Sequence, residues 1–105
     1  MEERIVEFKQ GTRESTVEAK LRDKVKDRGG LALKFVSPGY TGVPDRLLLA
    51  PGGKLIFAEV KAPGKKPTAL QEHRHNQLRA LGFKVNVVDS YATINSTLEE
   101  LFDEQ

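Results

Sequence analysis

The stretch from Gly42 to Lys66, GVPDRLLLAPGGKLIFAEVKAPGKK, constrains the fold of this chain more than any other. Two apolar runs, RLLLA and KLIFA, flank a Pro-Gly-Gly turn, and this spacing predicts a β-hairpin. Because the runs leave little room for a polar face, we expect both strands to be covered, at least in part, on both sides. Each strand nevertheless carries a carboxylate, Asp45 or Glu59, and Lys61 follows the second one.

These three charged residues are expected to converge at one end of the hairpin. Side chains alternate in direction along a strand, so Glu59 and Lys61 point to the same side. Antiparallel pairing brings the end of the second strand back to the start of the first, where Asp45 lies. An aspartate after a proline is alone more typical of a turn, and Glu-x-Lys of a solvated edge pair. Their combination at matching ends of one hairpin favours a functional site.

Two close carboxylates in a partly buried site repel each other unless a cation lies between them. Mg²⁺ commonly takes one or two protein carboxylates and leaves positions for water and a phosphate oxygen. Such an ion lowers the pKa of its bound water and polarises the phosphate. Lys61 is placed to orient or help deprotonate that water, or to neutralise the charge of a phosphorane. The pattern therefore indicates hydrolysis of a phosphodiester.

The remaining sequence predicts an α/β fold with a mixed sheet and the element order α-β-β-β-α-β-α. A helix is predicted over residues 15–30, because Val17, Leu21 and Val25 recur every four residues. The helix between the third and fourth strands is long enough for a right-handed crossover. The strands are predicted over residues 31–37, 43–50, 54–62 and 83–90, and the other helices over residues 68–82 and 96–105.

Helix starts are predicted from their capping residues. Ser15 followed by Glu18 fits a capping box, Thr68 is the expected N-cap of the second helix, and Ser96 or Thr97 that of the third. The inner side of the helix over residues 68–82 is predicted to carry Leu70, Gln77, Leu78 and Leu81.

Composition bounds the classes of protein to consider. The 105 residues suit a single domain, with residues 1–13 as a polar lead-in that is flexible or contacts a dimer partner through its IVEF segment. There is no cysteine, so a metal would be held by oxygen ligands or histidine. The net charge of +2 is only weakly typical of polyanion binding. We expect a cytoplasmic protein with no membrane partner and no nucleotide cofactor.

The hairpin motifs also carry a family resemblance. GVPD followed by FAEVKAPGKKPTALQ resembles the PD-(D/E)xK nuclease superfamily. Residues 29–90 are similar to the VRR-NUC family, the virus-type replication-repair nuclease domain, through GGLALKF, SPGYTGVPDRLLL, GGKLIFAEVKAPG and LGFKVNVVDS. The resemblance implies a restriction-endonuclease-like core, with a mixed β-sheet flanked by helices. It also implies a nuclease that needs Mg²⁺ or Mn²⁺.

The family's site roles fall on matching positions of this chain. By resemblance, Asp45 and Glu59 would be metal ligands, the backbone carbonyl of Val60 would complete the protein side, and Lys61 would be the catalytic lysine. Gln71 would hydrogen-bond near the metal-bound water or the scissile phosphate.

Glu18 matches the acidic residue of the family's first helix, which approaches the metal directly or through water. A capping role is the alternative for Glu18, because one carboxylate can hardly do both.

Further residues are candidates for DNA contact. Lys65 and Lys66 follow the catalytic strand in a Gly/Pro loop and are expected to meet phosphates. Lys34 faces either the active site or solvent. Tyr40 and Arg46 are candidates to line the DNA groove. His73 and His75, the two histidines, face different directions on a helix and are expected on the surface rather than in a shared metal site.

The functional expectation is a metal-dependent endonuclease acting on branched DNA. The resemblance to stand-alone family members implies a homodimer that cuts four-way (Holliday) junctions, and a bacteriophage source. Two active sites related by a two-fold axis would suit the symmetry of a junction. The alternatives are a nuclease that processes flaps or ends, and a catalytically idle DNA-binding or assembly module. Since Asp45, Glu59 and Lys61 are all present, the idle module is disfavoured.

Overall fold

The structure, a computed structural model, describes residues 6–103. Its elements follow the predicted order of helices and strands. Their bounds are α1 Glu14–Asp27, β1 Leu31–Lys34, β2 Arg46–Ala50, β3 Lys54–Val60, α2 Ala69–Ala80, β4 Val85–Val88 and α3 Tyr91–Phe102. No helix of this described part is both long and apolar enough to cross a membrane.

The four strands form one mixed sheet in the order β1-β2-β3-β4. β2 and β3 are the predicted antiparallel hairpin, in which Leu48 faces Ile56 and Arg46 faces Ala58. β1 pairs antiparallel with β2, and β4 pairs parallel with β3 after the α2 crossover. The hairpin with the two acids therefore occupies the centre of the sheet.

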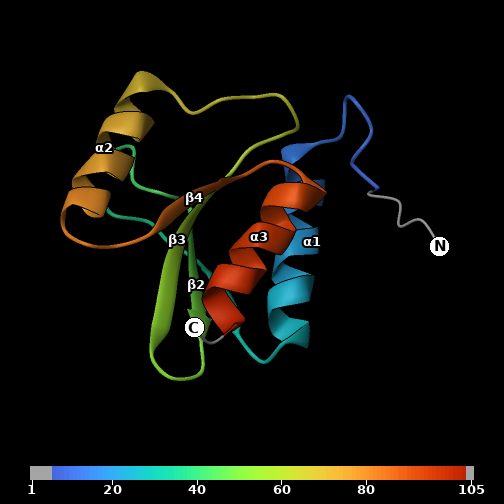
Figure 1. Cartoon of the computed structure of the whole chain (residues 1–105). Coiled ribbons are helices and arrows are strands. Elements are labelled where there is room, and N and C mark those ends of the chain that lie inside the picture. Colours follow the sequence, from blue (N-terminus) through green and yellow to red (C-terminus); the bar gives the residue numbers. More distant parts are fainter. Residues whose placement is uncertain (1–5, 104–105) are drawn as a thin grey trace.

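The apolar core lies between one face of this sheet and the helices α1 and α3, which run side by side in Figure 1. The predicted stripe on α1 is confirmed, since Val17, Leu21 and Val25 are buried. They pack with Leu48, Ile56, Ala58, Val60, Val88, Ile94, Leu98 and Leu101. Helix α2 lies on the other side of the sheet and contacts β4 (Figure 1). Two side chains of this helix, Gln71 and His75, contact Glu59 of β3.

Two predicted helix starts are wrong. α1 begins at Glu14, where the flanking Arg13 gives no side-chain cap, so the expected Ser15–Glu18 capping box is absent. α3 begins several residues before the predicted start, because Ser90 caps it and forms a capping box with Thr93. Thr93 replaces the Glu or Gln that usually marks this motif in a sequence. The predicted Thr68 cap of α2 is confirmed.

The predicted inner side of α2 is also wrong. Leu70, Gln77 and Leu81 are exposed, and only Leu78 of the predicted set is half-buried. The buried residue of the helix is His75. The loop before β2 packs on this helix at Gly42, whose φ is +96°, and a Cβ there would lie 2.9 Å from Leu70 Cγ. Only glycine suits this close approach with positive φ. The GVPD loop is thus fixed against α2.

The N-terminal segment lies on α3 from residue 6 onward. Both carboxylate oxygens of Glu7 accept hydrogen bonds from the N-terminus of α3, from the backbone N–H groups of Tyr91 and Ala92. The ring of Phe8 stacks on Tyr91 with 4.1 Å between centroids. The first five residues lie outside the described part, and a dimer contact through residues 5–8 stays a prediction.

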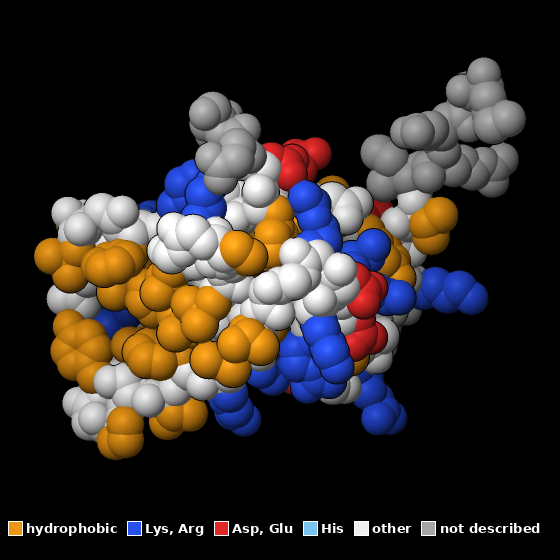
Figure 2. Space-filling model, turned by 90° about the horizontal axis from the view of Figure 1, so that it is seen from below, with side chains coloured by type: hydrophobic (Ala, Val, Ile, Leu, Met, Phe, Trp, Pro, Cys, Tyr) orange, Lys and Arg blue, Asp and Glu red, His pale blue; other side chains and the backbone are white. Residues whose placement is uncertain are grey.

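The sheet face opposite α1 and α3 is covered only in part. Leu31 and Leu33 of β1 face Leu49 and Leu47 of β2, and they are 58% and 43% exposed. Phe83, 45% exposed, meets the same face through an edge contact with Phe57. Figure 2, seen from below, shows apolar side chains gathered in one area of the surface. Both faces of the hairpin are thus covered at least in part, as expected, because every residue of β2 and β3 is buried or half-buried. Around β1 and Phe83 the molecule keeps an open apolar face.

Candidate active site

The structure brings Asp45, Glu59 and Lys61 together at one end of the hairpin, as the strand pattern predicts. Asp45 directly precedes β2, and its Oδ1 accepts a hydrogen bond from the backbone N–H of Val60 at 3.1 Å. Lys61 follows β3, and its Nζ lies 3.9 Å from Glu59 Oε2. The antiparallel register thus brings two acids that are 14 residues apart in the sequence close together in space.

Glu59 is the most enclosed member of this group, with 3% of the residue exposed. Its Oε1 lies 3.2 Å from His75 Nε2, and its Oε2 accepts a hydrogen bond from Gln71 Nε2 at 3.4 Å. Gln71 is also the N3 residue of the α2 capping box, and its Oε1 accepts a hydrogen bond from the backbone N–H of Thr68, the N-cap. The cap therefore orients the Gln71 amide toward the acid.

Both carboxyl groups hold their protons more tightly than usual. Burial, together with the negative charge of Asp45, raises the pKa of Glu59 from its ordinary value of 4.5 to about 7, against the lowering effect of Lys61. Burial also raises the pKa of Asp45, against the lowering effect of the Val60 hydrogen bond. Each acid is therefore costly to ionise without a compensating cation.

This donor set fits a hard divalent cation. Two carboxylates and a backbone carbonyl, that of Val60, are oxygen ligands of the kind that Mg²⁺ and Mn²⁺ prefer. In the described part of the chain, no group of three or more His, Cys, Asp or Glu side chains could hold an ion on its own. Water and substrate oxygens would therefore have to fill the remaining positions, as is usual for Mg²⁺.

Glu18, the acid predicted to approach the metal, is held by Arg46. The guanidinium donates to Glu18 Oε2 from Nε at 3.0 Å and lies 2.9 Å from it through Nη2. Arg46 is only 7% exposed, and its Nη1 also donates to the carbonyl of Ala32. Its predicted place in a DNA groove does not fit this burial, because Nε, Nη1 and Nη2 each contact a group inside the protein.

Glu14 is an acid near the site that sequence reasoning missed. After burial, its negative charge is among the causes that raise the pKa of both Asp45 and Glu59, whereas Glu18 acts in this way only on Asp45. Glu14 is the first residue of α1 and lies one turn before Glu18, on the same side of the helix. The four-residue spacing from Glu18 was the sequence feature that could have identified Glu14 as a second acid on the same side of the helix.

The other predicted DNA contacts lie at different places. Lys34 is exposed and pairs with Arg46 on the neighbouring strand, so the two side chains share one face of the sheet. Arg46 in turn pairs with Ala58, so this face is the one opposite to Glu59. Tyr40 lies over α2, where its hydroxyl donates to Gln77 Oε1 at 2.9 Å and Arg74 stacks on its ring at 3.9 Å. The structure does not bring these two residues to the acids.

Lys65 and Lys66 lie in the loop between β3 and α2. Both are exposed and line a cleft of about 340 Å³. Arg79 and His75 line the same cleft, and His75 contacts Glu59. Glu72 and Asp89 line this cleft as well, so it carries charges of both signs. Phosphate contact by Lys65 and Lys66 stays a prediction.

The predicted surface position of His75 is wrong, although His73 is exposed as expected. His75 is 1% exposed, and burial lowers its pKa, with Arg79 contributing in the same direction. The available signal was its position four residues after Gln71, which places both side chains on the same side of α2.

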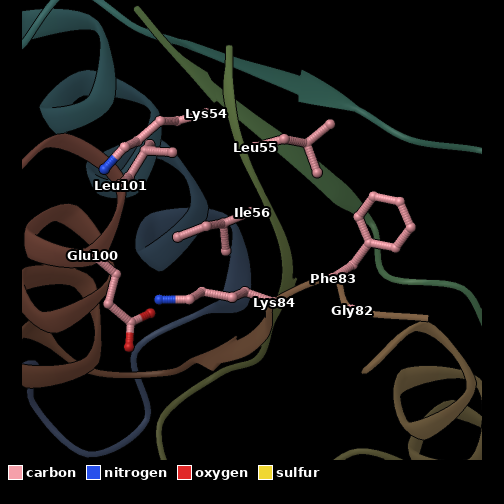
Figure 3. Close-up of a pocket in the computed structure, with 8 residues that line it drawn as sticks. All are labelled: Lys54, Leu55, Ile56, Gly82, Phe83, Lys84, Glu100 and Leu101. Atoms are coloured by element: carbon pink, nitrogen blue, oxygen red, sulfur yellow. The ribbon is translucent and has the colours of Figure 1, made fainter. Parts of the chain in front are cut away.

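A separate hollow of about 230 Å³ lies at the other end of the sheet, between β3, β4 and α3. Figure 3 shows Ile56 and Leu101 at this hollow, with the amine of Lys84 directed toward the carboxylate of Glu100. None of the predicted site residues lines it. The carboxylate group described above is therefore the candidate active site.

The fold and this group of side chains define a nuclease-like α/β domain of the PD-(D/E)xK type. A solved structure described as a VRR_NUC domain matches the chain with a TM-score of 0.76 and 31% sequence identity, over 88% of this chain and 99% of that one. The chain is 55% identical over 78 residues to "Putative nuclease p44" of Acyrthosiphon pisum secondary endosymbiont phage 1, covering 74% of this chain and 84% of that protein. A scan against protein-family profiles gives no match. The chain belongs to the VRR-NUC family.

Proposed function

We propose that this protein is a Mg²⁺- or Mn²⁺-dependent deoxyribonuclease that hydrolyses phosphodiesters inside DNA strands. The observation that carries the proposal is the meeting of Asp45, Glu59 and Lys61 at one end of the central hairpin. Membership in a nuclease family and a phage relative named as a nuclease support it. On this proposal the protein acts in the cytoplasm of a bacterial host.

Each residue of the group has a role in this proposal. Asp45, Glu59 and the Val60 carbonyl hold the divalent ion, which when bound supplies a water of lowered pKa and neutralises phosphate charge. The Lys61 ammonium, beside Glu59, orients that water or compensates the charge that develops on the phosphate. Gln71 holds Glu59 by its hydrogen bond and presents its amide to the water or the phosphate.

The DNA backbone would approach along the cleft that Lys65 and Lys66 line, where His75 forms the link to Glu59. Both lysines are exposed there, so their ammonium groups are open to a phosphate. Phosphate contacts of this kind position a strand without reading its sequence. The site therefore suits recognition of DNA shape better than recognition of bases.

The preferred substrate is branched DNA, such as a four-way junction, cut by a homodimer. The open apolar face around Leu31, Leu33 and Phe83 supports a dimer, because large exposed apolar patches commonly mark protein interfaces. A two-fold arrangement would present two active sites to opposing strands of a junction.

The test is cleavage of matched synthetic four-way, flapped and linear DNAs by the full-length chain, with Mg²⁺ or Mn²⁺. We expect paired, symmetric cuts in the junction that exceed those in the other substrates. Preferential cutting of the flap or of free ends would replace junction cleavage with the end-processing alternative. Binding without cutting of any substrate, in either metal, would contradict the nuclease proposal itself.

A further inference from the structure

His75 is one of four buried polar or charged residues in the described part of the chain, the others being Arg46, Glu59 and Thr97. It lies outside the apolar core formed by α1, α3 and the opposite sheet face. A position that is 1% exposed and needed only for packing would be expected to carry an apolar side chain. The polar edge of His75 therefore calls for a specific partner.

That partner is the carboxylate of Glu59, at 3.2 Å from His75 Nε2 to Oε1. The second oxygen, Oε2, is approached by Gln71 Nε2 at 3.4 Å and by Lys61 Nζ at 3.9 Å. Gln71 and His75 are one turn apart on α2, so one helix face supplies a polar partner to each oxygen of the same acid. Such a pair of contacts fixes both the position and the rotation of the carboxylate.

We propose that His75 is a positioning residue for Glu59: its Nε2–H donates to Oε1 and holds the carboxylate in the orientation that binds the divalent ion. This inference rests on the proposed metal-binding role of Glu59. A carboxylate oxygen has lone pairs for more than one partner, so the contact from His75 leaves Glu59 able to bind a cation. Hydrogen-bond partners of this kind typically contribute about 10–100-fold to metal affinity or activity.

The test is a calorimetric titration of the full-length protein with Mn²⁺, without DNA. We expect His75→Leu to weaken Mn²⁺ binding by about 10–100-fold, because it leaves Oε1 without its donor. His75→Gln, whose amide can donate from nearly the same place, should restore most of the affinity. His73→Leu, on the exposed side of the same helix, is the matched control and should bind as the unmodified protein does.

A second measurement needs no variant and decides the matter if His75→Leu does not fold. Nitrogen-detected NMR of the histidine rings, in excess Mg²⁺ at about pH 8.5, is expected to show a proton on Nε2 of His75 that exchanges slowly with water. An unprotonated Nε2 cannot donate and would overturn the proposal. A folded His75→Leu that binds Mn²⁺ as tightly as the unmodified protein would also overturn it.

These outcomes are distinct from failure of the proposed function. If the unmodified protein binds no Mn²⁺, the metal-site proposal fails and the role of His75 fails with it. If the unmodified protein binds Mn²⁺ and His75→Leu binds it equally well, only the role of His75 is lost.

Discussion

Asp45 accepts a hydrogen bond from the backbone N–H of Val60, the residue next to Glu59, at 3.1 Å. The bond ties the start of one central strand to the end of its neighbour. Asp45 cannot move away from Glu59 without breaking this bond, so the two acids stay close although their charges repel. The hairpin itself therefore imposes the proximity that a divalent cation would relieve.

Ionisation of Glu59 should destabilise the metal-free protein. Its pKa is raised from 4.5 to about 7, so the folded state holds the proton more tightly than the unfolded state does. The stabilisation is present at low pH and is lost as pH rises from about 5 through 7, by roughly 3 kcal/mol in total. Glu59→Gln should remove this loss, so its stability advantage in EDTA should grow between about pH 5 and 8.

Urea unfolding of the unmodified protein and Glu59→Gln, at matched pH values, measures this difference. The comparison is needed because burial lowers the pKa of His75, which makes the protein less stable at low pH and opposes the effect of Glu59. A stability difference that stays constant over this range would contradict the raised pKa of Glu59.

Lys61 should matter for chemistry and not for metal affinity. Lys61→Gln is expected to slow DNA cleavage by about 10²–10⁴-fold, the usual range for a residue that assists proton transfer or stabilises charge. Mn²⁺ binding should not weaken, because the substitution removes a positive charge near the ion. Lys84→Gln, at the far hollow, is the control. Normal cleavage by Lys61→Gln would exclude the proposed role.

Glu14 and Glu18 should have separable effects. Glu18→Gln leaves the buried Arg46 guanidinium without its charged partner and should lower the free energy of unfolding by about 1–3 kcal/mol. Glu14→Gln should leave stability nearly unchanged and weaken Mn²⁺ binding, because Glu14 acts electrostatically on both Asp45 and Glu59. Urea unfolding and calorimetry measure the two quantities. Weaker Mn²⁺ binding by Glu18→Gln, with unchanged binding by Glu14→Gln, would instead assign the metal-site role to Glu18.

The open apolar face around Leu31, Leu33 and Phe83 should form the interface of the proposed homodimer. Leu33→Glu places a charge on that face and should convert a dimer into a monomer in sedimentation velocity runs. Val6→Glu, on the exposed N-terminal segment, should remain dimeric. Dissociation by Val6→Glu alone would move the interface to the N-terminal segment, and a monomeric unmodified protein would contradict both locations.

The central hairpin and its acids were predictable because the information is local. The turn type, the apolar runs and the two-residue period of a strand together place Asp45 opposite Glu59 and give Lys61 the same direction as Glu59. The stripe on α1 has the same character, since its spacing depends only on the helix period.

The burial of His75 and Arg46 was not predictable from local pattern. Each side chain is buried where a helix packs on the sheet, and its partner is an acid from a different element of the chain. His75 contacts Glu59, and Arg46 contacts Glu18. A polar residue is predicted to be exposed from the sequence unless its hydrogen-bond partner is known. The capping residue of α3 was missed for a related reason, because Thr93 replaces the usual acid or amide.

The most direct test of the account is single-turnover cleavage of a four-way DNA junction by the unmodified protein and by Asp45→Asn. The account predicts cleavage with Mg²⁺ that EDTA abolishes, and a rate for folded Asp45→Asn that is lower by at least about 10³-fold. Lost Mn²⁺ binding by Asp45→Asn should accompany the lower rate. Cleavage in EDTA, or cleavage by Asp45→Asn at the unmodified rate, would contradict a metal-dependent site built on Asp45 and Glu59.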